Sequence, residues 1–294
     1  MTPSLVAPAA PLFTRLQGSG PHTILCLHSS TGSHAQWRSL SNTLAAHARV
    51  VSVDFHGHGR SPAWPPEVPV TLQVDAQAAD QAVRDAAHDA DGVHLVAHSY
   101  GAAVALQLAL DHPGRIRSLS LYEPVAFGLL HGAPAAAQPL AEIEAIADEV
   151  ALLTAQGDRA AAAEAFVDYW GGPGAWQQMG ESQRDAVQVR ITAIPRHFSA
   201  LFRARWTAHD LSALRMPTLL MHGGRTRASA RRVADLLAQS LPGVHRHELA
   251  GAAHLGPMTH EAAVNARVVE HLYACGALPA LAGAKTGATA AQPA

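Results

Sequence analysis

Short apolar segments alternate with longer amphipathic segments along most of this 294-residue chain. Apolar runs bounded by glycine, proline or polar residues predict strands at 12–16, 22–27, 49–54, 93–97, 116–122, 217–222 and 244–249. Between them, helical periodicity predicts helices at 35–47, 71–90, 100–111, 228–240 and 260–274. Alternation of this kind predicts an α/β fold with a mostly parallel central sheet flanked by helices.

One segment, 128–210, interrupts this alternation. It has no obvious strand pattern and is rich in Ala, Glu and Gln, so we interpret it as a helical cap lying over the edge of the sheet. Residues 276–294 lack periodicity and are rich in Ala, Gly, Pro and Thr, which predicts a disordered tail. The predicted organisation is a core domain of 1–127 and 211–275, a cap of 128–210 and a tail of 276–294.

Composition excludes several classes of function. The formal net charge is −2, and no stripe of Lys or Arg predicts binding to nucleic acid or to an anionic membrane. No run of about 18 apolar residues predicts a membrane span, and Met1–Pro11 does not resemble a secretory signal. We therefore expect a cytoplasmic protein. Its two cysteines do not form a disulfide framework, and the oligomeric state stays open, with a homo-oligomer as one alternative.

The segment 93–105, VHLVAHSYGAAVA, joins an apolar strand to a helix through small residues, with Ser99 at the turn. Such a turn holds a serine hydroxyl above the edge of the sheet, where a substrate can reach it. Here Ala97 stands where glycine is usual. Ser99 is the candidate nucleophile, and the competing interpretation is a polar helix cap.

A serine nucleophile needs a base, and His254 is the candidate among 19 histidines. It alone follows the final strand in a loop of small residues, which can return to the serine. The oxyanion that forms when serine attacks a carbonyl also needs donors. We assign the backbone N–H of Tyr100, at the start of a helix, and the N–H of Ser30, in the loop after the strand 22–27.

With these features the chain, from about 12 to 275, resembles an α/β-hydrolase of the serine hydrolase or esterase type. Leu27-His28, a small-residue loop and Trp37 resemble the oxyanion segment of that family, and DFHGHGRS at 54–61 resembles its next turn. In that turn His56 replaces the more usual Arg. The insertion 128–210 lies where the family carries its cap.

The chain departs from this family at the third member of the catalytic triad. Most relatives carry an aspartate shortly after the strand matching 217–222, whereas Thr226 stands there in this chain. Glu123, followed by Pro124, ends the preceding strand at the same edge as Ser99, and some branches of the family take their acid from that position. We therefore assign Glu123 as the orienting acid, with Asp210 as the alternative.

Other residues suggest other chemistry. His56 with His58, and His245 with His247, have the spacing of metal ligands, but no nearby carboxylate or thiolate completes either pair, so we expect no metal. The cap tryptophans Trp170, Trp176 and Trp206 line an acyl pocket or pack the cap onto the core.

The resulting hypothesis is a cofactor-independent serine hydrolase that cleaves a carboxylic ester or related acyl bond of a small-molecule substrate. Its triad is Ser99, His254 and Glu123, and it reacts through an acyl-enzyme. A carbon–carbon bond hydrolase and an acyltransferase are alternatives that use the same triad. A non-catalytic ligand-binding protein is the alternative from another class.

Overall fold

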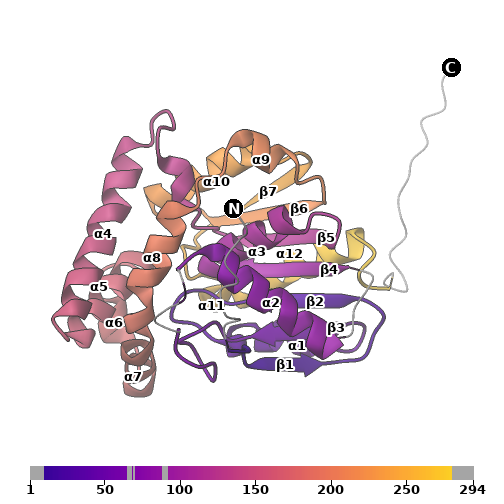
Figure 1. Ribbon diagram of the computed structural model, residues 1–294, viewed down its shortest axis with the longest axis horizontal. Helices are drawn as coiled ribbons and strands as arrows, with labels where there is room; N and C mark the ends of the chain where they lie inside the picture. The colour runs from indigo at the N-terminus through magenta and orange to yellow at the C-terminus, as the bar shows by residue number, and fades with distance from the viewer. Residues whose placement is uncertain (1–9, 65–67, 69, 88–91, 280–294) are drawn as a thin grey trace, which may run out of the picture.

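A computed structural model describes residues 10–64, 68, 70–87 and 92–279, and within them all seven predicted strands are present (Figure 1). The strands are β1 (Thr14–Gln17), β2 (Thr23–Leu27), β3 (Arg49–Val53), β4 (Val93–His98), β5 (Ile116–Tyr122), β6 (Thr218–Gly223) and β7 (Val244–Leu249). They form one sheet in the order β1-β3-β2-β4-β5-β6-β7. Only β1 runs antiparallel, against β3, so the predicted mostly parallel sheet is confirmed.

The described helices include a long series between β5 and β6. They are η1 (His34–Trp37), α1 (Arg38–Leu44), α2 (Leu72–Ala87), α3 (Tyr100–Asp111), η2 (Phe127–Leu130), α4 (Ala137–Ala155), α5 (Arg159–Gly171), α6 (Ala175–Gln178), α7 (Glu181–Arg190), η3 (Ile191–Ala193), α8 (Ile194–Arg203), α9 (Ala208–Ser212), α10 (Ala228–Ser240), α11 (Gly256–Thr259) and α12 (Glu261–Ala274). Helices α3 and α10 have the predicted bounds, and residues 88–90 of the helix predicted at 71–90 lie outside the described residues.

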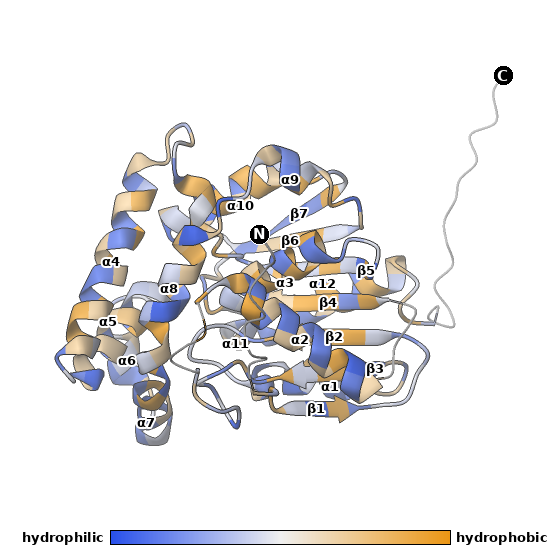
Figure 2. Ribbon diagram, viewed as in Figure 1, coloured by the Kyte–Doolittle hydropathy of each residue, from blue (hydrophilic) through white to orange (hydrophobic). Residues whose placement is uncertain are grey.

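Helices cover both faces of the sheet. The larger hydrophobic cluster includes buried residues of α2, α3 and α10, and the smaller one includes buried residues of α1 and α12. Strands β2 and β4 are consequently buried along their whole length, which explains why their sequences are nearly continuous apolar runs. Figure 2 shows the hydrophobic colours concentrated in the sheet and mixed colours on the outer helices.

The helices of the predicted cap group together at one end of the sheet (Figure 1). Aromatic rings join this group to the core: Phe127 of η2 stacks with Trp170 of α5 and Phe198 of α8, at ring-centroid distances of 6.5 and 6.4 Å. Within the described part of 128–210 there are helices and no strand. The exact division of the chain into core, cap and tail stays a prediction.

Two segments differ from the sequence-based expectation. The helix expected at 35–47 begins as the 3-10 helix η1 and ends at Leu44, because Gly18 and Gly20 pass directly against the backbone of 45–48. At the other end, Ala277 and Leu278 belong to the segment expected to be disordered, yet both are buried against the smaller cluster. The remainder of that tail, 280–294, lies outside the described residues. No helix of the described chain is long and apolar enough to cross a membrane.

Candidate active site

Ser99 lies in a strained turn between β4 and α3. Its backbone φ of 56° is rare for a residue with a side chain, and the surrounding packing must hold it there. Gly101 allows the close approach that the turn needs, because a Cβ at that position would lie 2.5 Å from the carbonyl oxygen of His28. Ala97 is completely buried and fits where glycine is usual. The Ser99 side chain lines a cavity.

His254 lies in the loop between β7 and α11, and its Nε2 is 2.9 Å from Ser99 Oγ. Two residues of the core fix the backbone of this loop. The Tyr122 hydroxyl donates to the carbonyl of Ala253 at 2.7 Å, and His98 Nε2–H donates to the carbonyl of His254 at 2.9 Å. His98 and Tyr122, which precede Ser99 and Glu123 in the chain, therefore hold the loop that bears His254.

The Glu123 carboxylate lies on the other side of the imidazole. His254 Nδ1–H donates to its Oε2 at 2.7 Å, and the same oxygen accepts the Thr226 hydroxyl at 2.6 Å. The backbone N–H of Gly223 donates to Oε1 at 2.8 Å. Because a carboxylate only accepts, His254 must carry its proton on Nδ1, which leaves Nε2 free to accept the proton of Ser99.

These contacts also keep Glu123 ionised. Burial by itself would raise the pKa of the Glu123 carboxyl, since it disfavours the charged form. The hydrogen bond and charge of His254, together with the bonds from Thr226 and Gly223, outweigh burial and lower this pKa below its ordinary value. Thr226 stands where relatives are expected to carry the acid, and here its hydroxyl supports an acid that comes from the neighbouring strand.

The two proposed oxyanion donors lie in the loop after β2 and at the start of α3. The N–H of Ser29 donates to Gln36 Oε1 at 3.0 Å. Among the described residues, the N–H groups of Ser30 and Tyr100 have no acceptor, as donors reserved for a substrate oxygen require. Ser30 lines the cavity beside Ser99, and its hydroxyl shares a 2.8 Å hydrogen bond with His197 Nδ1.

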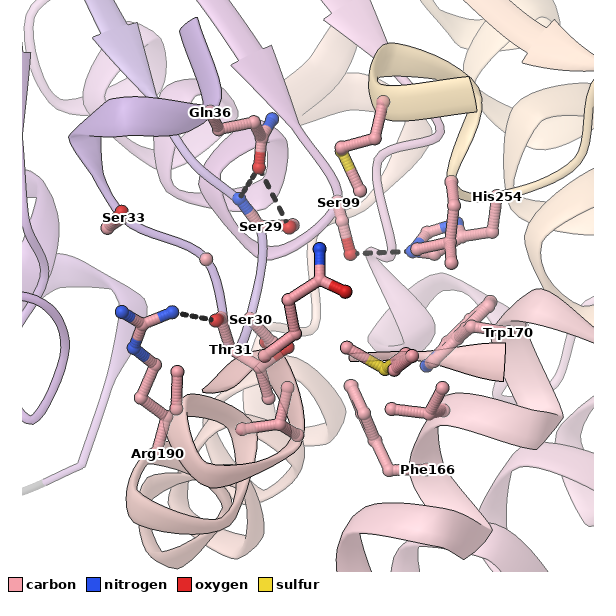
Figure 3. Close-up of a pocket in the computed structure, with 18 residues that line it drawn as sticks. Ser29, Ser30, Thr31, Ser33, Gln36, Ser99, Phe166, Trp170, Arg190 and His254 are labelled. Carbon is pink, nitrogen blue, oxygen red and sulfur yellow. Dashed lines mark hydrogen bonds between the residues drawn. The ribbon is translucent and has the colours of Figure 1, made fainter. Parts of the chain in front are cut away.

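The cavity above Ser99 has a volume of about 410 Å³ (Figure 3). Trp170 of α5 lines it and also stacks on His254, with ring centroids 3.8 Å apart and planes 28° apart. The sequence suggested that the cap tryptophans line a pocket or pack, and Trp170 does both. Its position against the base could not be read from local pattern, because it depends on how α5 packs on the core.

The alternative candidates lie elsewhere or already have partners. Asp210 is exposed and caps α9 by bonding Thr207, so it takes no part in this arrangement. The ring nitrogens of His56 bond Asp75 and the carbonyl of Ala10. Within the described residues no group of three His, Cys, Asp or Glu side chains could hold a metal ion.

Comparisons with known proteins concern the family and the fold of the chain. The family model for the alpha/beta hydrolase fold matches residues 22–261. A protein of Variovorax paradoxus named "Putative carbamate hydrolase RutD" is 31% identical over 89% of this chain and 96% of its own length.

Other matches are partial or structural. The dihydrolipoyllysine-residue acetyltransferase component of the acetoin cleaving system of Cupriavidus necator is 38% identical over 38% of this chain, which spans only 29% of that protein. The crystal structure of the enol-lactonase of Burkholderia xenovorans superposes with a TM-score of 0.70 and 21% identity, covering 89% of this chain and 96% of that one. At that identity the likeness concerns the fold alone.

Proposed function

The chain belongs to the alpha/beta hydrolase fold family, and from that premise we propose that it is a cofactor-independent serine hydrolase that cleaves a carboxylic ester or related acyl bond. The observation that carries the proposal is the unbroken hydrogen-bonded series from Ser99 through His254 to Glu123. Each member comes from a different part of the chain, and each bond has the length and direction that acyl transfer requires.

The reaction follows from this geometry. His254 Nε2 accepts the Ser99 proton as Oγ bonds to the acyl carbon, and the carbonyl electron pair moves onto its oxygen. The N–H groups of Ser30 and Tyr100 receive that oxyanion, and one such donor contributes about 2.7–4 kcal/mol elsewhere. The oxyanion then collapses, the bond to the leaving group breaks, and His254 returns the proton to it.

Water completes the cycle. His254 accepts a proton from a water molecule that attacks the acyl carbon. The second collapse breaks the bond between that carbon and Ser99 Oγ, His254 returns the proton to Oγ, and the acid leaves. Glu123 holds Nδ1–H throughout and stabilises the imidazolium that forms in both halves. Trp170 covers one face of the imidazole, which excludes water from it and attracts its positive charge with about 0.5–2 kcal/mol.

The experiment is labelling with a fluorophosphonate probe together with hydrolysis of p-nitrophenyl esters of increasing chain length. We expect the probe to modify Ser99 and the Ser99→Ala protein to lose both labelling and turnover. Ser33→Ala is the matched control: Ser33 lines the same cavity, but among the described residues its hydroxyl makes no hydrogen bond to a histidine, so this variant should keep the label. A wild-type protein that is not labelled would favour the alternative of a non-catalytic ligand-binding protein. Transfer of the acyl group to an added alcohol without hydrolysis would favour the acyltransferase.

A further inference from the structure

The cavity above Ser99 has two chemically different parts. Side chains of α5, α7 and the segment after His254 make one part apolar, and these include Phe166, Val187 and Leu255. The loop 29–33 and the end of α7 make the other part polar. Figure 3 shows Arg190 beside this loop, on the opposite side of the view from the Ser99–His254 pair.

Arg190 is the only permanently charged residue among the 18 that line the cavity, all of which are described, and none of the 18 is acidic. Its side chain is partly buried, and Nη1–H donates to the carbonyl of Thr31 at 2.8 Å. A guanidinium has five N–H donors in a planar fork. In the described part of the chain, no carboxylate lies within ion-pair distance of it and no second acceptor engages it.

Among the described residues, no acid forms an ion pair with Arg190. Asp54 attracts Arg190 through space, but its carboxylate bonds the backbone and ring of His34 and the N–H of Arg60 rather than the guanidinium. Burial, together with the smaller effect of the Arg190 charge, lowers the pKa of His28 to about 4 and that of His58 to about 3, so both rings are neutral at pH 7. The Arg190 guanidinium therefore keeps N–H donors that no group of the described chain engages, beside the polar part of the cavity.

We propose that Arg190 binds a carboxylate of the substrate, so that the preferred substrate is an acyl compound carrying a second, free carboxylate group. The apolar part of the cavity takes the carbon chain between or beside the two groups. Arginine suits this role because its fork pairs with both oxygens of a carboxylate. The inference rests on the proposed function, since it places the other carbonyl of that substrate at Ser99.

The test compares the p-nitrophenyl hydrogen esters of adipic, pimelic and suberic acid, each beside its own methyl ester. The two members of a pair have the same chain and differ in one negative charge. We expect the wild-type protein to favour at least one acid form over its methyl ester by about 10- to 100-fold in kcat/KM, mainly through KM, which is the size of a charge-assisted hydrogen bond. Arg190→Gln should remove this preference, because it lowers kcat/KM of the acid form by about 10- to 100-fold more than that of its methyl ester.

Arg184→Gln is the matched control. Arg184 lies on the same helix α7, with its guanidinium 6.0 Å from the ring of Trp176, and it does not line the cavity. This variant should keep the preference, and Arg190→Lys, which retains the charge without the fork, should keep part of it. Should Arg190→Gln fail to fold, adipate should still inhibit the wild-type protein competitively against a neutral ester.

Two results would overturn the inference. One is a wild-type protein that shows no preference in any pair and no inhibition by adipate. The other is an Arg190→Gln protein that loses kcat equally on both members of a pair, which would mean that Arg190 only supports the Thr31 loop. In both cases, hydrolysis of the methyl esters by the wild-type protein that depends on Ser99 would leave the proposed function unaffected. If the wild-type protein does not hydrolyse the methyl esters, the proposed function itself is refuted.

Discussion

Replacing Glu123 by glutamine tests the acid of the triad most directly. The three hydrogen bonds of the carboxylate define what the amide changes. Its oxygen can still accept the Gly223 N–H, but its NH2 group then faces His254 Nδ1, which must become an acceptor. The proton moves to Nε2, and Nε2 can no longer accept the proton of Ser99.

The expected loss follows from this change of tautomer. Turnover should fall about ten-thousand-fold, as it does when a triad aspartate becomes asparagine, which corresponds to about 5 kcal/mol of transition-state stabilisation. The assay is kcat on a p-nitrophenyl ester, with circular dichroism and a thermal melt to show that the protein is folded. Asp210→Asn, the other sequence-based candidate, is the matched control and should be fully active.

Thr226 offers a second arm of the same test. Its hydroxyl and His254 Nδ1 bond the same oxygen of Glu123, so an acid at this position is next to the imidazole. We expect the double variant Glu123→Ala/Thr226→Asp to have a kcat at least about tenfold higher than that of Glu123→Ala alone, because a carboxylate again accepts Nδ1–H. A folded Glu123→Gln protein within tenfold of wild-type turnover would refute the assignment of the acid.

Three further predictions concern stability and reactivity. Gly101→Ala should lower the free energy of unfolding by about 1–3 kcal/mol, because the added Cβ meets the backbone of His28, and urea denaturation measures this. The folded-state pKa of Glu123 is lowered, so the contribution of its carboxylate to stability is complete above its unfolded pKa of about 4.3 and is lost as the pH falls through the folded value. The difference in unfolding free energy between wild type and Glu123→Gln should therefore shrink below about pH 4. A constant difference from about pH 3 to 7 would contradict this. Burial raises the pKa of the Cys26 thiol to about 12, so iodoacetamide at pH 8 should leave Cys26 unmodified in the native protein, as mass spectrometry of peptides will show.

Sequence reasoning predicted positions that follow from local pattern, and it missed contacts that depend on packing. Glu123 could be predicted because Pro124 cannot continue a strand, and parallel strands end at one edge of the sheet. Its contact with Thr226 spans 103 residues, and no local pattern indicates it. The same holds for Trp170 on His254, which depends on how α5 docks on the core.

Arg190 illustrates the same limit. In the sequence it is one of several charged residues at the end of an amphipathic helix, where a solvent-exposed position is the ordinary expectation. Only its bond to Thr31, 159 residues away, places it in the cavity. The fold class can be predicted from periodicity, but the chemistry of the polar part of the cavity depends on tertiary contacts.

Ser99 and Glu123 directly follow the adjacent strands β4 and β5, which are paired in register, His98 with Tyr122, and the Ser99 N–H donates to the Tyr122 carbonyl. We therefore expect these two groups to move together, and the loop bearing His254, which side chains hold through its carbonyl groups, to separate from them more readily. A moderate rise in temperature that opens this loop would abolish activity while the sheet retains its circular dichroism signal. Thermal inactivation should therefore occur at a lower temperature than unfolding. Substitutions that stabilise residues 250–255 should therefore prolong activity at elevated temperature more than substitutions that stabilise the hydrophobic core.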